Sequence, residues 1–404
     1  MERKILFTAS TYSHIVHFHR PYLRAFARLG YAVDVACGGT PMEIPEARQV
    51  IHLPLEKSMT APANFAAARQ LRKRIKTEGY TLVSTHTALA AFFTRLAAMG
   101  LDTTVVNTCH GYLFDEDTPR AKRSVLLAAE RLTASRTDLL LTMNDCDYRL
   151  ATRYRLGRRI KNIPGVGVDF SRFDACIPEL GHALRRELNI PAGAFVMVYP
   201  AEFSARKHQE TCIRAMAALP DNVYLLLPGM GVLRESCMEL AAQLGVMDRI
   251  RFPGYIADMG PWYQAADCAV TSSRSEGLPF NVMEAMYFGL PVVASAVKGH
   301  EDLIQEGGNG LLFPWNEAQA CAQAILKLAS DAQLRRELGN AGARAVEKYK
   351  LEHVLPQVME AYRPVLPELP TMEPVSYEKS VPVTTAAAVA TGTLFQLCQI
   401  RMTP

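Results

Sequence analysis

The chain has 404 residues, of which 49% are hydrophobic and 21% are charged, and its formal net charge at pH 7 is +4. This composition is that of an ordinary globular protein, and the length predicts two domains rather than a single core. The nine Cys are scattered singly, without a C-x2-C pair or a His cluster at ligand spacing, which argues against a zinc site or a disulfide framework and favours a reducing compartment.

The first half of the chain alternates short apolar runs with helical patterns, as a parallel α/β domain does. The first strand, Lys4–Ala9, is too short for the core of a signal peptide, and no stretch of the chain reaches the roughly 18 apolar residues of a membrane span. The motif G-x-G-x-x-G is missing, so a dinucleotide site has no support. We expect further strands at 31–36, 80–85, 105–108 and 138–142, and helices at 21–29, 64–77, 87–99, 124–135 and 145–154.

Histidines follow two of the expected strands. His14, His17 and His19 lie in the stretch Ser10–His19, which we expect to be a loop, and three such residues in one strand-to-helix connection indicate a polar lining of the cleft. His110 follows a later strand, where its imidazole can donate a hydrogen bond to a ligand or be tied to a nearby carbonyl in a structural role.

A linker rich in Gly and Pro, residues 163–169, separates the two expected domains. We place the first domain at residues 1–165 and the second at 170–350. Pro and small residues dominate the end of the chain, so residues 366–404 are predicted to be a disordered tail. The second domain is expected to contain strands at 195–200, 223–227, 250–255, 268–272 and 292–295, and helices at 208–219, 233–244, 259–266, 318–328 and 331–349.

The stretch Ser272–Ser295 predicts a loop, a helix and a second strand directly after a buried strand. We expect Asn281 to cap the helix and Gly289 to take the left-handed position after it. Glu276 in the loop and Glu284 in the helix stand beside a helix amino terminus, which attracts a phosphate, while a carboxylate can accept both hydroxyls of a sugar diol. An anion together with a diol indicates a nucleotide sugar. The alternative interpretation is that Glu284 merely favours a helix amino terminus and that Glu276 is solvated.

This stretch closely resembles the E-x7-E segment of the retaining glycosyltransferases of family 4. Its sequence from Glu276 onward is E-G-L-P-F-N-V-M-E-A-M-Y-F-G-L-P-V-V-A-S. Members of this family have the GT-B fold, an α/β architecture in which two Rossmann-like domains face each other across a cleft. The resemblance implies that Glu276 meets the hydroxyls of the donor sugar and that Glu284 meets the ribose of the nucleotide. The other donor-binding residues expected in this segment are Gly277, Leu278 and Asn281.

Further motifs extend the resemblance to about residues 1–362. The segment S-H-I-V-H-F-H-R-P-Y-L is similar to the start of members that build bacterial surface polysaccharides, and we include His14 among the donor-binding residues. At Cys109-His110-Gly111 the family places the histidine by the donor sugar, so His110 is a candidate catalytic residue. The words P-G-V-G-V-D resemble the interdomain crossover of the family, and the helix at 352–362 is expected to return onto the first domain.

The loop AEFSARKHQ occupies the place of a G-R-x-x-x-x-K-type segment, whose Arg and Lys hold the donor diphosphate in the family. Lys207 matches the Lys, Glu202 stands where the Arg commonly stands, and Arg206 is a candidate to supply the missing charge. A departing nucleotide diphosphate gains negative charge, so a cation at hydrogen-bond distance stabilises the transition state. The family also places the segment that ends at Tyr255 next to the nucleotide base, so we expect Tyr255 to stack there.

Positive charge is concentrated in the first half of the chain, in the clusters Arg69–Lys76, Arg120–Arg136 and Arg149–Lys161. Basic helices with apolar partners can lie on an anionic membrane or meet a lipid diphosphate, and a solvated helix face explains the same clusters. Nucleic acid is not expected as a partner, because the aromatic residues are not interleaved with these clusters in a stacking pattern.

The sequence therefore predicts a retaining hexosyltransferase that moves a sugar from a UDP-sugar to a lipid-linked or saccharide acceptor in the synthesis of capsule, exopolysaccharide or O-antigen. No metal or other cofactor is expected, because Lys207 and a helix amino terminus can hold the diphosphate. A nucleotide-sugar epimerase of the same fold and a non-catalytic carbohydrate-binding protein are the alternatives. We expect a cytoplasmic location, with the inner face of the membrane as a peripheral site.

Overall fold

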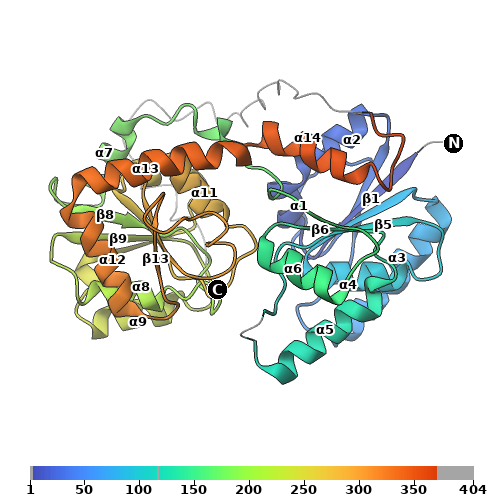
Figure 1. The fold of residues 1–404 in the computed structure, drawn as a ribbon, viewed down its shortest axis with the longest axis horizontal. Helices are drawn as coiled ribbons and strands as arrows, with labels where there is room; N and C mark the ends of the chain where they lie inside the picture. Colours follow the sequence, from blue (N-terminus) through green and yellow to red (C-terminus); the bar gives the residue numbers. More distant parts are fainter. Residues whose placement is uncertain (1–2, 116–117, 371–404) are drawn as a thin grey trace, which may run out of the picture.

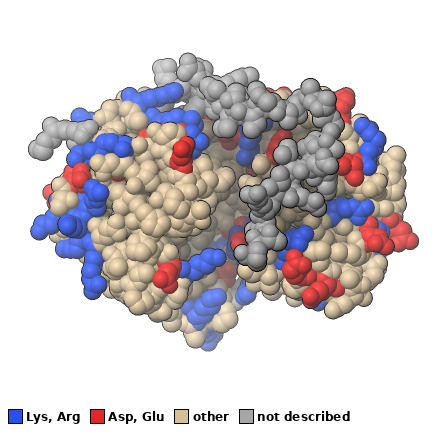
Figure 2. Space-filling model, turned by 180° about the vertical axis from the view of Figure 1, so that it is seen from behind, with Lys and Arg blue, Asp and Glu red and all other residues tan. Residues whose placement is uncertain are grey.

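The computed structural model describes residues 3–115 and 118–370, in which two α/β domains lie side by side (Figure 1). Each domain is built on one sheet whose strands all run parallel. Parallel strands need a crossover between them, which is why apolar runs alternate with helices along the chain. Figure 2 shows the surface hollowed between the two halves. The expected fold class, two Rossmann-like domains facing across a cleft, is confirmed.

The first sheet has seven strands in the order β3-β2-β1-β4-β5-β6-β7. Two of them, β3 and β7, are absent from the sequence prediction. Both are edge strands whose residues are mostly exposed or half-buried, so they lack the apolar run that indicates a strand. The bounds are β1 Lys4–Ala9, β2 Ala32–Cys37, β3 Gln49–His52, β4 Leu82–His86, β5 Thr104–Thr108, β6 Leu139–Thr142 and β7 Ile160–Asn162.

The helices of the first domain include one where we expected a loop. Most of the stretch 10–19 forms α1, because the Thr11 side chain accepts a hydrogen bond from the His14 backbone N–H and the buried Ile15 anchors the turn to the core. The expectation of a loop there is wrong. The bounds are α1 Tyr12–Phe18, α2 Arg20–Arg28, α3 Pro62–Glu78, α4 Ala88–Ala97, α5 Arg120–Ala134 and α6 Asp145–Tyr154.

The second sheet has six strands in the order β10-β9-β8-β11-β12-β13. Its central strands are buried at every position, as expected for a parallel sheet covered on both faces. The strand β13 is absent from the sequence prediction because three residues are too few to show a pattern. The bounds are β8 Phe195–Val198, β9 Val223–Pro228, β10 Ile250–Gly254, β11 Cys268–Thr271, β12 Val292–Ser295 and β13 Leu311–Phe313.

The helices of the second domain lie above and below this sheet (Figure 1). Three short 3-10 helices accompany them, of which η1, Phe170–Phe173, directly follows the linker. The bounds of the α-helices are α7 Pro178–Glu187, α8 Glu210–Met216, α9 Arg234–Gln243, α10 Gly260–Gln264, α11 Phe280–Tyr287, α12 Ala318–Ser330 and α13 Ala332–Val346; those of the other 3-10 helices are η2 Met247–Arg249 and η3 Glu347–Tyr349.

The helix α14, Leu351–Tyr362, leaves the second domain and packs against the first, beside α2 (Figure 1). The Tyr362 hydroxyl lies 2.8 Å from Ser84 Oγ, and its ring meets the ring of Phe26 at 5.5 Å between centroids. These contacts fix α14 to the first domain, although Tyr362 and Ser84 are more than 250 residues apart in the sequence. The expected return of this helix onto the first domain is confirmed.

The predicted tail begins too early. Leu366 and Leu369 are 1% and 3% exposed and belong to the hydrophobic core, so the chain stays packed at the start of the stretch we expected to be disordered. The remainder of that stretch, residues 371–404, lies outside the described residues. Among the residues that the structure describes, no helix has the length and apolar character that crossing a bilayer requires.

Candidate active site

The loop between β11 and α11 carries Glu276, which is held by two cations from the loop after β8. Lys207 Nζ lies 2.7 Å from one carboxylate oxygen of Glu276, and Arg206 Nη1 lies 2.6 Å from the other. Burial alone would raise the pKa of Glu276, but the charges of Lys207 and Arg206 outweigh it and hold the pKa at about 2. Glu276 is therefore a fixed, ionised carboxylate at neutral pH.

The second glutamate of the pair, Glu284, lies in α11 and has different partners. The Tyr263 hydroxyl donates a hydrogen bond to Glu284 Oε2 at 2.8 Å, and Arg172 of η1 forms an ion pair with Oε1. Burial raises the pKa of Glu284, and the Arg172 charge opposes this only in part. Sequence reasoning missed Arg172, because a single arginine after the linker belongs to no motif.

The helix α11 begins where we expect it, but it is not capped in the way that we expect. Pro279 occupies the cap position without a side-chain hydrogen bond, and Asn281 lies inside the helix, where its amide donates to the Pro200 carbonyl at 3.2 Å. The expectation that Asn281 caps the helix is wrong, because Pro279 holds the cap position and the Asn281 amide is bonded to Pro200 instead. Gly289 follows the last residues of the helix with a φ of +69°, so its predicted left-handed position is confirmed.

The loop of the second domain lies directly against the end of β5 in the first. A Cβ atom on Gly277 would come within 2.2 Å of the His110 carbonyl oxygen, so only glycine fits this approach of two backbones. The Asn144 side chain of the first domain also donates a hydrogen bond to the Gly277 carbonyl at 3.0 Å. The structure thus brings His110 beside Glu276, although 166 residues separate them in the sequence.

Two further residues that we expect to bind the donor lie at the borders of this region. Leu278 is 9% exposed and packs toward the linker at Gly165, where a Cβ atom on the glycine would lie 2.8 Å from the leucine side chain. Tyr255 follows β10 and is 71% exposed, so its ring is free to meet a planar group. Stacking of Tyr255 on a base stays a prediction.

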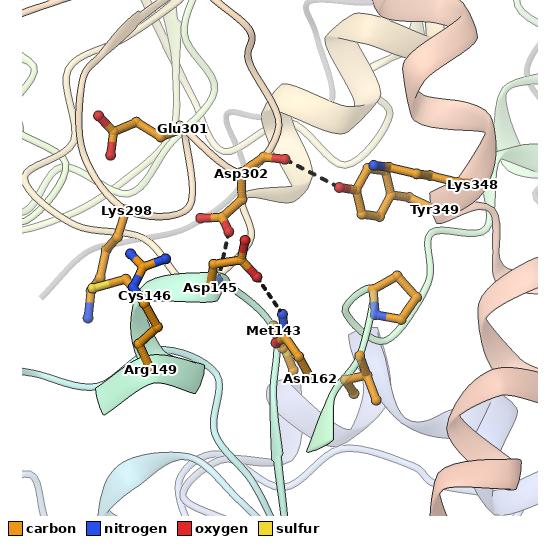
Figure 3. A pocket seen from close by; sticks show the side chains of 12 residues that line it. Met143, Asp145, Cys146, Arg149, Asn162, Lys298, Glu301, Asp302, Lys348 and Tyr349 are labelled. Carbon is orange, nitrogen blue, oxygen red and sulfur yellow. Dashed lines mark hydrogen bonds between the residues drawn. The ribbon is translucent and has the colours of Figure 1, made fainter. Parts of the chain in front are cut away.

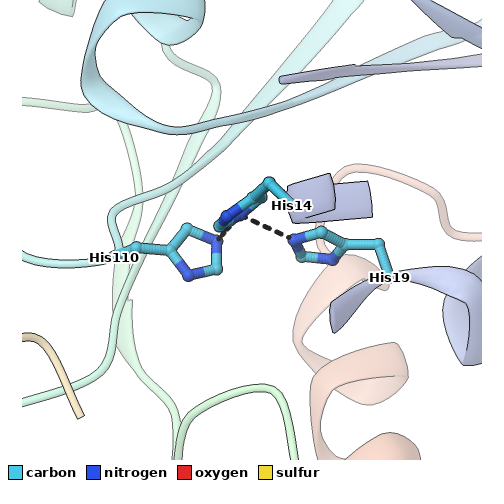
Figure 4. Close-up of side chains that lie close together, drawn as sticks. All are labelled: His14, His19 and His110. Atoms are coloured by element: carbon cyan, nitrogen blue, oxygen red, sulfur yellow. Dashed lines mark hydrogen bonds between the residues drawn. The ribbon is translucent and has the colours of Figure 1, made fainter. Parts of the chain in front are cut away.

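Four histidine rings gather on the first-domain side of this region. His14 and His110 lie with their ring centroids 4.4 Å apart, and those of His19 and His86 are 3.7 Å apart (Figure 4 shows three of the four). Burial lowers the pKa of each ring, and the neighbouring rings lower it further. Burial lowers the pKa of His14, to about 4. These imidazoles are therefore neutral at neutral pH.

The loop after β12 ties the second domain to the first. Lys298 Nζ donates to the Tyr112 carbonyl at 2.7 Å and lies 3.0 Å from Asp147 Oδ1, and both side chains are almost fully buried. The Asp145 backbone N–H, at the start of α6, donates to Asp302 Oδ1 at 2.8 Å. No local sequence pattern reveals these contacts, because the partners are 151 and 157 residues apart in the chain.

A cavity of about 500 Å³ opens at this junction, beside the linker (Figure 3). Its polar lining comes from the first turns of α6 and the end of β7 on one side and from the loop after β12 and η3 on the other. Charges of both signs face it. The charged residues that line it are Asp145, Arg149, Lys298, Glu301, Asp302 and Lys348.

Two family models match this chain, one in each domain. The family model for glycosyl transferases group 1 matches residues 182–345, and that for Glycosyltransferase Family 4 matches residues 22–172. The putative glycosyltransferase EpsD of Bacillus subtilis (strain 168) is 32% identical over 369 residues, which cover 90% of this chain and 97% of EpsD. A galactosyltransferase of Escherichia coli, which by its name uses UDP-Gal and α-D-GlcNAc-diphosphoundecaprenol, is 23% identical over 301 residues, or 72% of this chain and 77% of that protein.

Solved structures share the fold. HepE of Anabaena, crystallised with UDP and glucose, superimposes with a TM-score of 0.76 at 21% identity, over 90% of this chain and 100% of HepE. WaaG, a glycosyltransferase of lipopolysaccharide biosynthesis, superimposes with a TM-score of 0.69 at 20% identity, over 89% of this chain and 98% of WaaG. The architecture of two facing domains is therefore common to these proteins.

Proposed function

The chain belongs to glycosyltransferase family 4 and has the GT-B architecture, and from this membership we propose that it moves a hexose from a UDP-sugar to a lipid-linked or saccharide acceptor, with the anomeric configuration retained. We propose surface polysaccharide, such as capsule, exopolysaccharide or O-antigen, as the product to which this sugar is added. The observation that carries the proposal is the Glu276 carboxylate, which is fixed by two cations beside the backbone of His110.

The nature of the donor is supported by relatives. HepE was crystallised with UDP and with UDP-glucose, and the Escherichia coli relative is named for UDP-Gal. In this chain the start of α11 follows directly on the loop of Glu276, and the amino terminus of a helix attracts phosphate. We propose that the diphosphate lies there, with Glu284 on the ribose and Tyr255 near the base.

The same cations serve the proposed reaction. As the bond from the sugar carbon to the diphosphate breaks, the electron pair stays with the diphosphate. The oxygen of the acceptor hydroxyl forms the new bond to that carbon, and its proton passes to the departing diphosphate. Lys207 and Arg206 would stabilise the growing negative charge, while Glu276 orients the sugar and favours the positive charge on its ring. Arg206 is 48% exposed and Lys207 only 13%, so Lys207 is the stronger catalytic candidate.

We propose that no metal bridges the diphosphate. The triplet Asp145-Cys146-Asp147 has the spacing D-x-D, yet its carboxylates are already engaged: Asp145 Oδ1 accepts a hydrogen bond from Asn162, and Asp147 pairs with Lys298. A second such triplet, residues 115–117, extends beyond the described residues. Cationic side chains and a helix terminus are sufficient to neutralise a leaving diphosphate without an ion.

We also propose that the first domain contacts an anionic membrane through α5. Val125 and Leu132 on this helix are 70% and 59% exposed, and basic residues such as Lys122 and Arg131 are exposed beside them. Figure 2 shows Lys and Arg side chains gathered over the first-domain half of the molecule, at the left. Binding to vesicles with anionic lipid should weaken as salt rises; equal partitioning to neutral vesicles would refute this contact.

A panel of nucleotide sugars with lipid-linked acceptors tests the function. The proposed transferase releases UDP only when donor and acceptor are both present, and NMR of the product reports the retained configuration. An epimerase would convert the UDP-sugar without an acceptor, and a carbohydrate-binding protein would release no UDP. Either result would overturn the proposed function.

A further inference from the structure

Three histidine nitrogens from distant parts of the first domain converge on one point (Figure 4). His14 lies in α1, His19 lies between α1 and α2, and His110 follows β5. His14 Nε2 is 3.3 Å from His110 Nε2 and 3.3 Å from His19 Nε2, and ligand atoms of all three lie within 4.8 Å of one another. The linear spacing of the sequence could not reveal this set, because His110 is separated from His14 by 96 residues.

Hydrogen bonds among the rings cannot pair every one of these ring nitrogens. Each ring nitrogen offers one position in the ring plane, either a proton or a lone pair. His14 Nε2 faces two other Nε2 atoms at the same distance, so it can pair with only one of them. His110 Nε2 in turn also faces His86 Nδ1 at 3.3 Å. A cation between the rings would accept a lone pair from all three Nε2 atoms at once.

The spacing fits such a cation. Zinc–nitrogen bonds are about 2.0–2.1 Å long, so two ligands at the tetrahedral angle lie about 3.3 Å apart. Two of the three edges of the histidine set have this length, and the ligand atoms of His19 and His110 lie within 4.8 Å of each other.

The surroundings hold the rings in place. The ring of His19 packs on that of His86 at 3.7 Å, and His86 stacks on Phe7 at 5.6 Å. Ser84 Oγ lies 3.1 Å from His86 Nε2 and 2.8 Å from the Tyr362 hydroxyl, so α14 helps to orient the cluster. His14 and His110 are partly exposed, which leaves a path for an ion.

We propose that His14, His19 and His110 form a binding site for a late first-row divalent cation of the zinc class, with at least one coordination position left open. Three imidazoles without a carboxylate select Zn²⁺, Cu²⁺, Ni²⁺ or Co²⁺ over the hard ions Mg²⁺ and Ca²⁺. Two of these ligands, His14 and His110, are also expected at the donor sugar, so a bound ion would compete with the sugar for both rings.

Metal binding is measured directly on the full chain without an affinity tag. We expect calorimetry with Zn²⁺ to show one ion per chain, and we expect Co²⁺ to give the intense visible bands of a four-coordinate ion. Mg²⁺ and Ca²⁺ should produce no heat of binding. X-ray absorption at the zinc edge of the loaded wild-type protein should show three imidazole ligands, a readout that needs no variant and does not depend on transferase activity.

Variants assign the ion to this cluster. His19→Gln and His14→Gln should each weaken Zn²⁺ binding by at least about 100-fold, because even outer-shell partners of a ligand account for about 10–100-fold. His17→Gln is the matched control, since His17 lies in the same helix but is exposed and bound to the Ser13 carbonyl; its affinity should equal that of the wild type. Zinc bound without imidazole ligands, no bound ion, or equal losses in His17→Gln and His14→Gln would overturn the proposal.

Discussion

The two sides of the candidate site bury their polar groups in opposite ways. On the second-domain side, Glu276 is surrounded by cations, so its pKa falls to about 2 despite burial. On the first-domain side, the rings of His14, His19 and His110 lie against one another and against the ring of His86, so burial keeps them neutral. Burial alone therefore does not set the charge of a site. The charge depends on whether a counter-charge lies beside the buried group. Fixed charge thus lies where a diphosphate is proposed, and neutral donors and acceptors lie opposite.

Breaking the buried pair that joins the two sides should have the largest effect. Lys298→Met removes the charge that compensates buried Asp147, and removing one partner of a buried ion pair costs about 3–5 kcal/mol. Urea unfolding of the variant and the wild type measures this loss. Lys350→Met is the control, because its pair with Glu347 is partly exposed and surface pairs contribute about 0–1 kcal/mol. Equal losses in both variants would show that the domains are not held through Lys298.

Removing the main cation from the charged side should slow turnover more than it weakens binding. We expect Lys207→Ala to lower kcat by about 100-fold or more, or about 2.7 kcal/mol of transition-state stabilisation, with a smaller change in UDP affinity. Steady-state kinetics and UDP calorimetry measure the two quantities. The exposed Lys327→Ala serves as the control. Turnover at the wild-type rate in Lys207→Ala would exclude the proposed role.

The two glutamates of the charged side should separate in their effects. Glu284→Gln should weaken UDP by about 10-fold or more, since hydrogen bonds to a charged group contribute about 1.5–3 kcal/mol and the ribose is part of UDP. Glu276→Gln should leave UDP affinity nearly intact while kcat falls, because this carboxylate meets the transferred sugar. Calorimetry beside turnover tests both variants. The opposite pattern would reverse the roles, and full activity in both would argue against the transferase.

Forcing the two sides apart at their backbone contact should have a moderate effect. Gly277→Ala places a Cβ atom against the His110 carbonyl, and overpacking of this kind costs about 1–3 kcal/mol. Thermal unfolding should reveal the loss together with a reduced kcat/KM. Gly193→Ala is the matched control, since nothing lies within 4 Å of its added Cβ atom. An unchanged melting temperature in Gly277→Ala would mean that the two backbones do not touch in solution.

A change of pH should produce the smallest effect and sharpen the contrast within the charged side. The pKa of Glu284 is raised above 4.5, so this group takes up its proton first as the pH falls from neutral, whereas Glu276 stays ionised down to about pH 2. UDP affinity should therefore fall as the pH approaches 4.5, and Glu284→Gln should remove this part of the dependence. Comparing the two proteins cancels the titration of UDP itself. Identical pH profiles would assign the loss to another group.

Local structure can be predicted from the sequence alone wherever a pattern repeats within a few residues. Apolar runs and turn residues indicate the buried strands β11 and β12 and the left-handed Gly289. They also indicate the succession of strands and helices along the chain. The E-x7-E segment and Lys207 identified the family for a similar reason, since each is a short motif. Short or exposed elements such as β3 and β13 carry too few apolar residues to show such a pattern.

Contacts between side chains that are distant in the sequence depend on the tertiary structure. The pairing of Lys298 with Asp147 spans 151 residues, that of Arg172 with Glu284 spans 112, and the contact of His14 with His110 spans 96. Such contacts depend on the order of strands in each sheet and on how the two sheets face each other, which no local pattern encodes. The charges of the candidate site follow from these contacts, because a buried group takes its protonation state from the partners that the fold places beside it.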